Sequence, residues 1–177
     1  MADRRFIDPE GEEWASEFEY QVYEGLRILG YAVRKCGKGD SFTYTSAVIG
    51  GRCLECSSGR VRQERSYTPD LYVSDLPTET GPEGYYVEAK GYWNAHKRNL
   101  LRSAVRENKD LNPLFVFQSD KRATPKLTYT QYAAKYFPGS RVAIYPWYRG
   151  LKKQSTLDEK LAQFQASILR FSGSGEK

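Results

Sequence analysis

A short unbroken apolar segment, Leu-Phe-Val-Phe at residues 114–117, constrains the fold of this chain more than any other feature. Such a segment is typical of a buried strand, because a strand with one solvated face alternates apolar and polar residues. Helical patterns stand on both sides of it, at Asn94–Asn108 and Thr128–Phe137, and a last core strand is expected at Arg141–Tyr145. This alternation predicts an α/β fold, in which a mixed central sheet is flanked by helices.

The N-terminal half adds a helix and a hairpin to this core. Apolar spacing predicts a helix over Trp14–Leu29, and Gly30 stands where a helix C-terminal glycine belongs. Strands are predicted at Tyr67–Val73 and Tyr85–Lys90, and the turn-rich residues between them favour an antiparallel hairpin. The predicted order of elements is therefore that of one mixed α/β domain.

The predicted organisation has three parts. Residues 1–11 are expected to form a flexible arm, and residues 12–150 a single core domain. Within that domain, residues 36–66 form a bridge or β-ribbon insertion. After the domain, residues 151–177 form a C-terminal helix and tail.

The C-terminal helix is expected at Thr156–Phe171, since Thr156 and Glu159 have the spacing of a capping box. Its apolar residues lie alternately four and three positions apart, as in a short heptad seam. They are Leu157, Leu161, Phe164, Ile168 and Phe171. Two interpretations stay open: the helix packs onto its own domain, or it forms a dimer contact.

Charged residues on the second strand of the hairpin are the strongest chemical signal. Side chains alternate along a strand, so Glu88 and Lys90 point to one face while Val87 and Ala89 point to the other. If the hairpin pairs as predicted, Asp70 joins them. Two carboxylates and a lysine suit metal-assisted phosphodiester cleavage, because Mg²⁺ prefers oxygen ligands and a lysine can stabilise developing negative charge. A surface pair with an unrelated aspartate is the alternative.

A further acid comes from the first helix. On a helical wheel, Glu19 lies roughly 60° from the centre of the apolar face, whereas Glu17 lies roughly 140° away. Glu19 is thus the acid at the border of the buried face. It is placed to reach a site beneath the helix, although a flanking surface glutamate gives the same pattern.

Basic residues indicate a nucleic-acid partner. The chain has 27 Lys and Arg against 22 Asp and Glu, a modest net charge of +5 that permits such a partner without requiring one. Phosphate contacts are expected from one helix and from residues on and before the ribbon, with a plain solvated face as the alternative. The candidates are Lys97, Arg98, Arg102 and Arg106 on the helix, and Arg34, Lys35 and Arg65 near the ribbon.

The three cysteines favour free thiols. Cys53 and Cys56 form a C-x-x-C pair with Cys36 upstream, whereas a structural zinc site usually has four Cys or His ligands. Zinc held by these three and a fourth ligand, such as Asp40 or a group from another subunit, is the alternative.

Three stretches of this chain resemble the phage endonuclease I group of Holliday-junction resolvases, within the PD-(D/E)xK nuclease superfamily. They are Ser-Glu-Phe-Glu at 16–19 running on to Gly30, Tyr-Thr-Pro-Asp at 67–70 with Val-Glu-Ala-Lys-Gly-Tyr-Trp at 87–93, and the residues from Lys97 to Ser119. The likeness covers about residues 14–150. The combination of Y-T-P-D with V-E-x-K-G-x-W is far more specific than P-D and E-x-K alone.

The resemblance implies a restriction-endonuclease-like core, a nuclease domain at 12–150, and a domain-swapped homodimer. It implies that Asp70 and Glu88 bind Mg²⁺, with Mn²⁺ as a substitute, that the Ala89 carbonyl assists, that Lys90 serves the attacking water and that Glu19 completes the site. The implied reaction is cleavage of four-way DNA junctions that leaves 5′-phosphates. The 36–66 segment and the 70–88 connection are longer than the family pattern, and the last helix has no counterpart in it.

Alternatives to this function remain. One is a less selective endonuclease of the same superfamily, such as a restriction- or transposase-type subunit, and another is a catalytically silent junction-binding module. No apolar segment is long enough to span a bilayer and no signal core is evident, so a cytoplasmic protein, in the host cytoplasm if phage-encoded, is expected.

Overall fold

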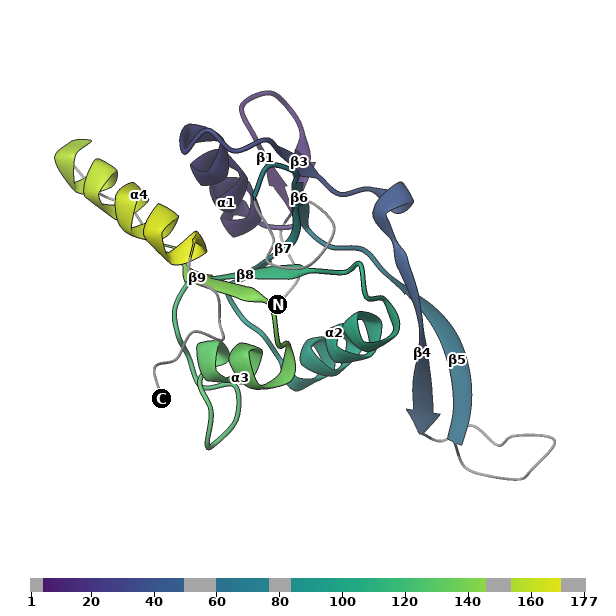
Figure 1. Ribbon diagram of the computed structural model, residues 1–177. Helices are drawn as coiled ribbons and strands as arrows, with labels where there is room; N and C mark the ends of the chain where they lie inside the picture. Colours follow the sequence, from purple (N-terminus) through teal and green to yellow (C-terminus); the bar gives the residue numbers. More distant parts are fainter. Residues whose placement is uncertain (1–4, 50–59, 77–83, 146–153, 170–177) are drawn as a thin grey trace.

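A mixed five-stranded sheet organises the protein (Figure 1). The computed structural model describes residues 5–49, 60–76, 84–145 and 154–169. In spatial order the strands are β3 (Val33–Lys35), β6 (Leu71–Val73), β7 (Tyr85–Lys90), β8 (Pro113–Phe117) and β9 (Arg141–Ile144). β6 runs antiparallel to both of its neighbours, β3 and β7, whereas β7, β8 and β9 run parallel to one another. The predicted α/β class and the hairpin of β6 and β7 are confirmed.

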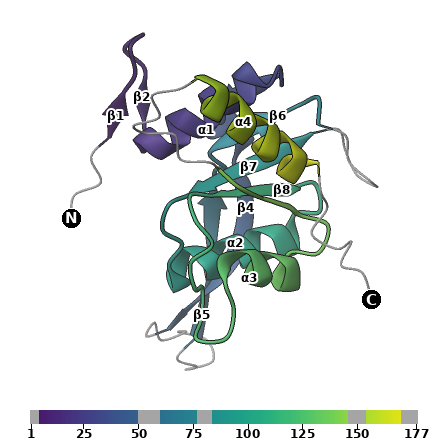
Figure 2. The ribbon, with the colours of Figure 1, turned by 90° about the vertical axis from the view of Figure 1, so that its left-hand side faces the viewer.

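Helices cover both faces of the sheet (Figure 2). Helices α1 (Glu17–Ile28) and α4 (Gln154–Ile168) lie on one face, and α2 (Ala95–Glu107) and α3 (Tyr129–Tyr136) on the other. Each face therefore has its own apolar core, and all five residues of β8 are buried between them. This burial explains why the β8 sequence is continuously apolar rather than alternating.

The first helix is anchored at both ends. Ser16 caps it by accepting a hydrogen bond from the Glu19 amide at 3.2 Å. At the other end Gly30 has a φ of +86°, and its N–H bonds to the Arg27 carbonyl while that of Tyr31 bonds to the Leu26 carbonyl. This is a Schellman motif, which needs the left-handed conformation that glycine adopts freely.

The start of α1 differs from the sequence prediction. Trp14 does not belong to the helix but to β2 (Glu13–Trp14), which pairs with β1 (Phe6–Ile7). Trp14 still fills the α1 core, and its indole N–H donates to buried Asp8 at 2.9 Å. Residues 6 and 7, expected in a loose arm, are therefore paired, because this bond and the β1–β2 ladder hold them against the helix.

One close contact sets the position of α1 on the sheet. A Cβ at Gly25 would lie 2.6 Å from the Tyr145 hydroxyl oxygen, so a larger residue at position 25 would clash with a buried ring. That hydroxyl donates to the Gln21 carbonyl at 2.8 Å. Glycine thus allows α1 to lie directly against Tyr145 at the end of β9.

The expected ribbon is present as β4 (Phe42–Ile49) and β5 (Arg60–Tyr67), preceded by a 3₁₀ turn, η1 (Lys38–Asp40). The two strands extend away from the sheet (Figure 1). Near the body, buried Tyr44 packs in the α2 core, and the Thr45 amide donates to Glu107 of α2 at 2.8 Å. The strand expected over Tyr67–Val73 is divided, because β5 ends at Tyr67 and β6 begins at Leu71.

The last helix packs onto its own domain. Leu161, Phe164 and Ile168 are buried, and Phe164 contacts the Tyr145 ring edge-to-face at 4.8 Å between centroids. Of the two interpretations of its seam, the structure thus shows the contact within the domain. The capping box was wrong, since α4 begins at Gln154 and Thr156 lies inside it. Phe171 and the Leu157 side chain lie outside the described part. None of the described helices combines the length and apolarity needed to cross a membrane.

Candidate active site

Asp70, Glu88 and Lys90 meet at the sheet, as the alternation on β7 and the pairing of the hairpin predicted. The Lys90 ammonium lies between the two acids, with Nζ 2.7 Å from Asp70 Oδ2 and 2.7 Å from Glu88 Oε2. The Ala89 amide donates to Asp70 Oδ2 at 2.9 Å. The aspartate is thus fixed both by a backbone group of β7 and by the lysine.

The strand register brings these residues together. On β7, Val87 and Ala89 face the α1 core, so Glu88 and Lys90 face the opposite layer. Leu71 pairs with Val87, which places Asp70, just before β6, beside the Ala89 amide. Pro69 precedes Asp70 and is buried, and it ends the ladder where the aspartate must turn toward β7.

Burial and charge act strongly on this group. Burial raises the pKa of Glu88, which is only 2% exposed, and the charge of Lys90 opposes that effect. Burial acts to lower the pKa of Lys90, but the charges and hydrogen bonds of Asp70 and Glu88 outweigh it and raise that pKa above its usual range. Lys90 is therefore held as an ammonium ion and is not a base in this arrangement.

Glu19 reaches the same group from the other layer of the fold. It is 6% exposed on α1, and its pKa is raised from 4.5 to about 7, first by burial and second by the charge of Asp70. Lys90 and Lys35 oppose this shift. One chain thus brings Glu19 within electrostatic range of Asp70.

The donor set fits a divalent cation. Asp70 and Glu88 flank one buried ammonium and Glu19 lies within electrostatic range of them, an excess of negative charge that a cation would neutralise. Glu88 Oε1 is buried and has no hydrogen-bond partner among the described residues. In the described part of the chain no three Cys, His, Asp or Glu side chains form one metal-binding group. The set therefore fits an ion held by two carboxylates plus water or substrate oxygens, with Lys90 displaced from between them.

A pocket of about 210 Å³ opens beside the carboxylates. Asp70, Glu88 and Lys90 line it, together with Lys97 at the start of α2. Asn94 caps that helix by accepting from the Lys97 amide at 2.8 Å, which fixes where Lys97 stands. Lys97 is exposed, so the sequence-predicted phosphate contact at this position is compatible with the structure.

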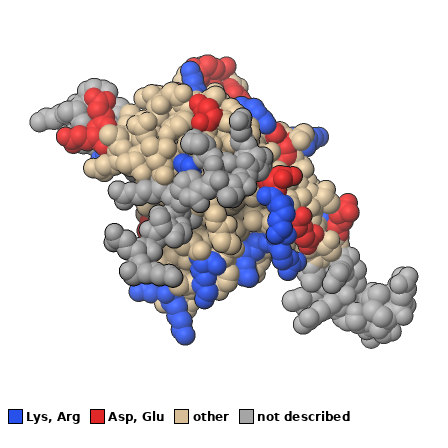
Figure 3. Space-filling view, in the orientation of Figure 1, with Lys and Arg blue, Asp and Glu red and all other residues tan. Residues whose placement is uncertain are grey.

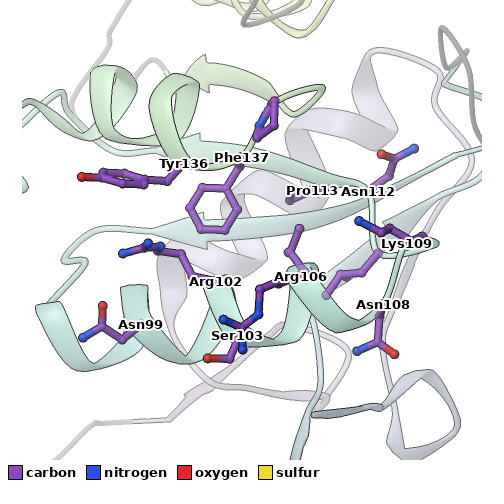
Figure 4. Close-up of a pocket in the computed structure, with 13 residues that line it drawn as sticks. Asn99, Arg102, Ser103, Arg106, Asn108, Lys109, Asn112, Pro113, Tyr136 and Phe137 are labelled. Atoms are coloured by element: carbon purple, nitrogen blue, oxygen red, sulfur yellow. The ribbon is translucent and has the colours of Figure 1, made fainter. Parts of the chain in front are cut away.

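The three candidate arginines of α2 do not line this pocket. Arg98 is buried at 8% exposure, donates to the Trp93 carbonyl and lies over the Tyr132 ring at 5.1 Å. Its assignment to DNA contact is corrected, because its guanidinium is used inside the α2–α3 core. Arg102 and Arg106 line a separate pocket of about 530 Å³ at the other end of the helix (Figure 4).

The three basic residues near the ribbon that were expected to contact phosphate differ in how far their side chains are already bound within the protein. Arg34 pairs with Asp40 through two hydrogen bonds of 2.8 and 2.6 Å, and Lys35 lies over the Trp14 ring and bonds to Glu12 at 3.1 Å. Arg65 is exposed, with one hydrogen bond to Gln63 at 3.3 Å. Lys and Arg side chains also gather over α2 and α3 on the face in Figure 3.

Cys36 is a free thiol, and burial raises its pKa to about 12. Cys53 and Cys56 lie outside the described residues, as does the zinc hypothesis that rests on them.

A comparison of the chain with protein-family models, curated proteins and solved structures finds no match. The functional argument therefore depends on the geometry of the site.

Sequence reasoning missed two residues of the pocket, Tyr67 and Trp93. Tyr67 belongs to the Y-T-P-D stretch and was expected only as the start of a strand, and Trp93 belongs to the V-E-x-K-G-x-W stretch and, as an aromatic next to the site, favoured core packing over stacking on DNA. The signal was their position, since each stands within three residues of a site residue.

Proposed function

We propose that this protein is a metal-dependent endonuclease that hydrolyses phosphodiester bonds in DNA, with a preference for four-way junctions and 5′-phosphate products. The observation that carries the proposal is the buried group in which Lys90 bridges Asp70 and Glu88 while Glu19 approaches from the opposite layer. A protein that only binds DNA gains nothing from buried carboxylates next to a phosphate backbone.

The residues divide the chemistry between them. Asp70 and Glu88 would hold Mg²⁺ or Mn²⁺, with the Ala89 carbonyl and Glu19 completing the ligand set. The cation, when bound, supplies charge neutralisation at the phosphate and acidifies a bound water. Lys90 keeps its proton and, once displaced from the carboxylates, donates to the attacking water or to the charged phosphate oxygens.

Two further features of the proposal come from the resemblance. The mixed sheet with helices on both faces is compatible with a restriction-endonuclease-like core. We propose a homodimer, because a four-way junction presents two symmetric strands to be cut. Exposed Lys97 next to the carboxylates supports contact with the scissile strand.

Cleavage of matched DNA substrates tests this function. The protein is incubated with Mg²⁺ and either a synthetic four-way junction or a linear duplex of the same sequence. The proposal predicts paired cuts in the junction and slower cleavage of the duplex. Equal cleavage of both overturns the junction preference and supports a less selective nuclease, whereas absence of cleavage with Mg²⁺ and Mn²⁺ overturns the nuclease.

The same assay separates an enzyme from a binding module. Lys90→Met removes the ammonium but none of the exposed basic residues, so the variant is expected to lose cleavage and still bind the junction. Lys121→Met is the matched control, because Lys121 is exposed and lines neither pocket. A wild-type protein that binds but never cuts identifies the module instead.

A further inference from the structure

Three residues that line the smaller pocket each carry an unpaired buried polar atom. The Tyr67 hydroxyl, the Trp93 indole nitrogen and Glu88 Oε1 are each buried without a hydrogen-bond partner among the described residues. Tyr67, Trp93 and Glu88 all line the pocket of about 210 Å³. Leaving a polar group buried and unpaired costs about 1–3 kcal/mol, so three of them around one pocket need a reason.

The chemistry of these atoms differs across the pocket. Glu88 and Asp70 are acceptors, which suit a cation, whereas the Trp93 N–H can only donate and the Tyr67 hydroxyl has a free proton to donate. Lys97 adds an exposed ammonium at the pocket. The residues that line the pocket thus combine the acceptors of Asp70 and Glu88 with the donors of Tyr67, Trp93 and Lys97.

An oxyanion next to a cation satisfies both parts at once. A phosphate group offers several anionic oxygens, which accept hydrogen bonds and also coordinate a divalent ion. Water alone would satisfy the donors but would not explain why Lys97 and the two carboxylates line the same pocket. The cavity volume of about 210 Å³ accommodates a phosphate group with its water.

We propose that this pocket is a phosphate-binding subsite, in which the Tyr67 hydroxyl and the Trp93 indole N–H donate to one non-bridging oxygen of the phosphodiester. The proposal rests on the proposed function, because it takes the phosphate of a DNA strand as the ligand. Trp93 is 1% exposed and held by the rings of Phe115 and Phe117, so its N–H is a preorganised donor. The two groups would bind the phosphate both before and after hydrolysis.

The test compares two Tyr→Phe variants that differ in how the hydroxyl is used. Tyr67→Phe removes a hydroxyl without a partner, whereas Tyr145→Phe removes one that donates to the Gln21 carbonyl at 2.8 Å. Without ligand, the melting temperature of Tyr67→Phe is expected to equal or exceed that of the wild type, and that of Tyr145→Phe to fall. A fall for Tyr67→Phe equal to that for Tyr145→Phe overturns the unpaired hydroxyl and the proposal with it.

Inorganic phosphate serves as the probe in the second measurement. In the presence of Mg²⁺, Tyr67→Phe is expected to bind phosphate about tenfold more weakly than the wild type, the loss of one charge-assisted hydrogen bond. Tyr145→Phe is expected to bind it as the wild type does. Equal affinity in Tyr67→Phe overturns the subsite, and a wild type that cleaves DNA at the same time leaves the nuclease proposal standing. A wild type that binds phosphate through Tyr67 but cuts no DNA rejects the nuclease and keeps the subsite.

Discussion

At the scale of the residue, Lys90 is the centre of the candidate site. Its ammonium stands between Asp70 and Glu88 at 2.7 Å from each, so it occupies the place between the carboxylates that a divalent cation would take. The side chain is 15% exposed, and removing one partner of a buried ionic group leaves the others uncompensated. Lys90 therefore stabilises the metal-free protein and would serve the reaction when the cation takes its place.

Lys90→Met should destabilise the metal-free protein by about 3 kcal/mol, the cost of breaking a buried ion pair. Urea unfolding in the presence of a chelator measures this, with Lys121→Met as the exposed control. Added Mg²⁺ should recover more stability in Lys90→Met than in the wild type, since the ion no longer competes with the ammonium. Equal stability of the variant and the wild type would contradict the bridging role.

Glu19 gives the metal-free protein a defined pH dependence. Its pKa is about 7 in the folded state and near 4.5 when unfolded, so the folded state holds the proton more tightly. The stability this provides is fully present below pH 4.5 and is lost as pH rises toward 7. Glu19→Gln does not titrate, so it does not lose this stability as pH rises. Its unfolding free energy relative to that of the wild type should therefore increase by up to about 3 kcal/mol across that interval. If the difference in unfolding free energy between Glu19→Gln and the wild type stays the same from pH 4.5 to 8, the raised pKa of Glu19 is rejected.

At the scale of the element, α4 is part of the α1 core. Phe164 is fully buried against Tyr145, so Phe164→Ala should cost about 3–5 kcal/mol of unfolding free energy. Gln163→Ala changes an exposed residue of the same helix and should cost little. Denaturant unfolding at two protein concentrations measures both. A loss for Phe164→Ala that depends on concentration would point to a dimer contact instead.

Local patterns predicted most elements because they record which face is buried. The alternation on β7 and the helical patterns from Asn94 and from Thr128 all describe local geometry, and the structure confirms them as β7, α2 and α3. Trp14 was misassigned because its period matched α1, while its actual partner is Asp8 in the adjoining β1–β2 unit. A helical wheel describes only contacts along one helix, so it could not predict this partner.

The candidate site was predictable where strand register decides it and not where packing does. Glu88 and Lys90 share a face by alternation, so the sequence was sufficient for them. Arg98 looked like its neighbours Arg102 and Arg106, but only the fold shows it buried under Tyr132. The unpaired atoms of Tyr67 and Trp93 likewise depend on tertiary contacts that no spacing encodes.

At the scale of the whole molecule, one chain brings Glu19 of α1 near Asp70 and Lys90. An exchanged dimer would instead take Glu19 from one chain and Lys90 from the other. Co-refolding Glu19→Gln chains with Lys90→Met chains separates these arrangements, because exchange gives one intact site in each mixed dimer. The arrangement in this structure predicts no recovery of junction cleavage, whereas recovery above either variant alone would show exchange.

The rate of junction cleavage across a Mg²⁺ titration, for the wild type and for Glu88→Gln, tests the proposed metal site most directly. Glu88→Gln keeps the size of the side chain but removes the charge of a carboxylate whose Oε1 atom has no hydrogen-bond partner among the described residues. Wild-type cleavage is expected to depend on Mg²⁺, and cleavage by Glu88→Gln to be slower by about 10²-fold or more. Cleavage that persists in chelator, or that is unchanged in Glu88→Gln, would contradict a metal-dependent site built on Asp70, Glu88 and Lys90.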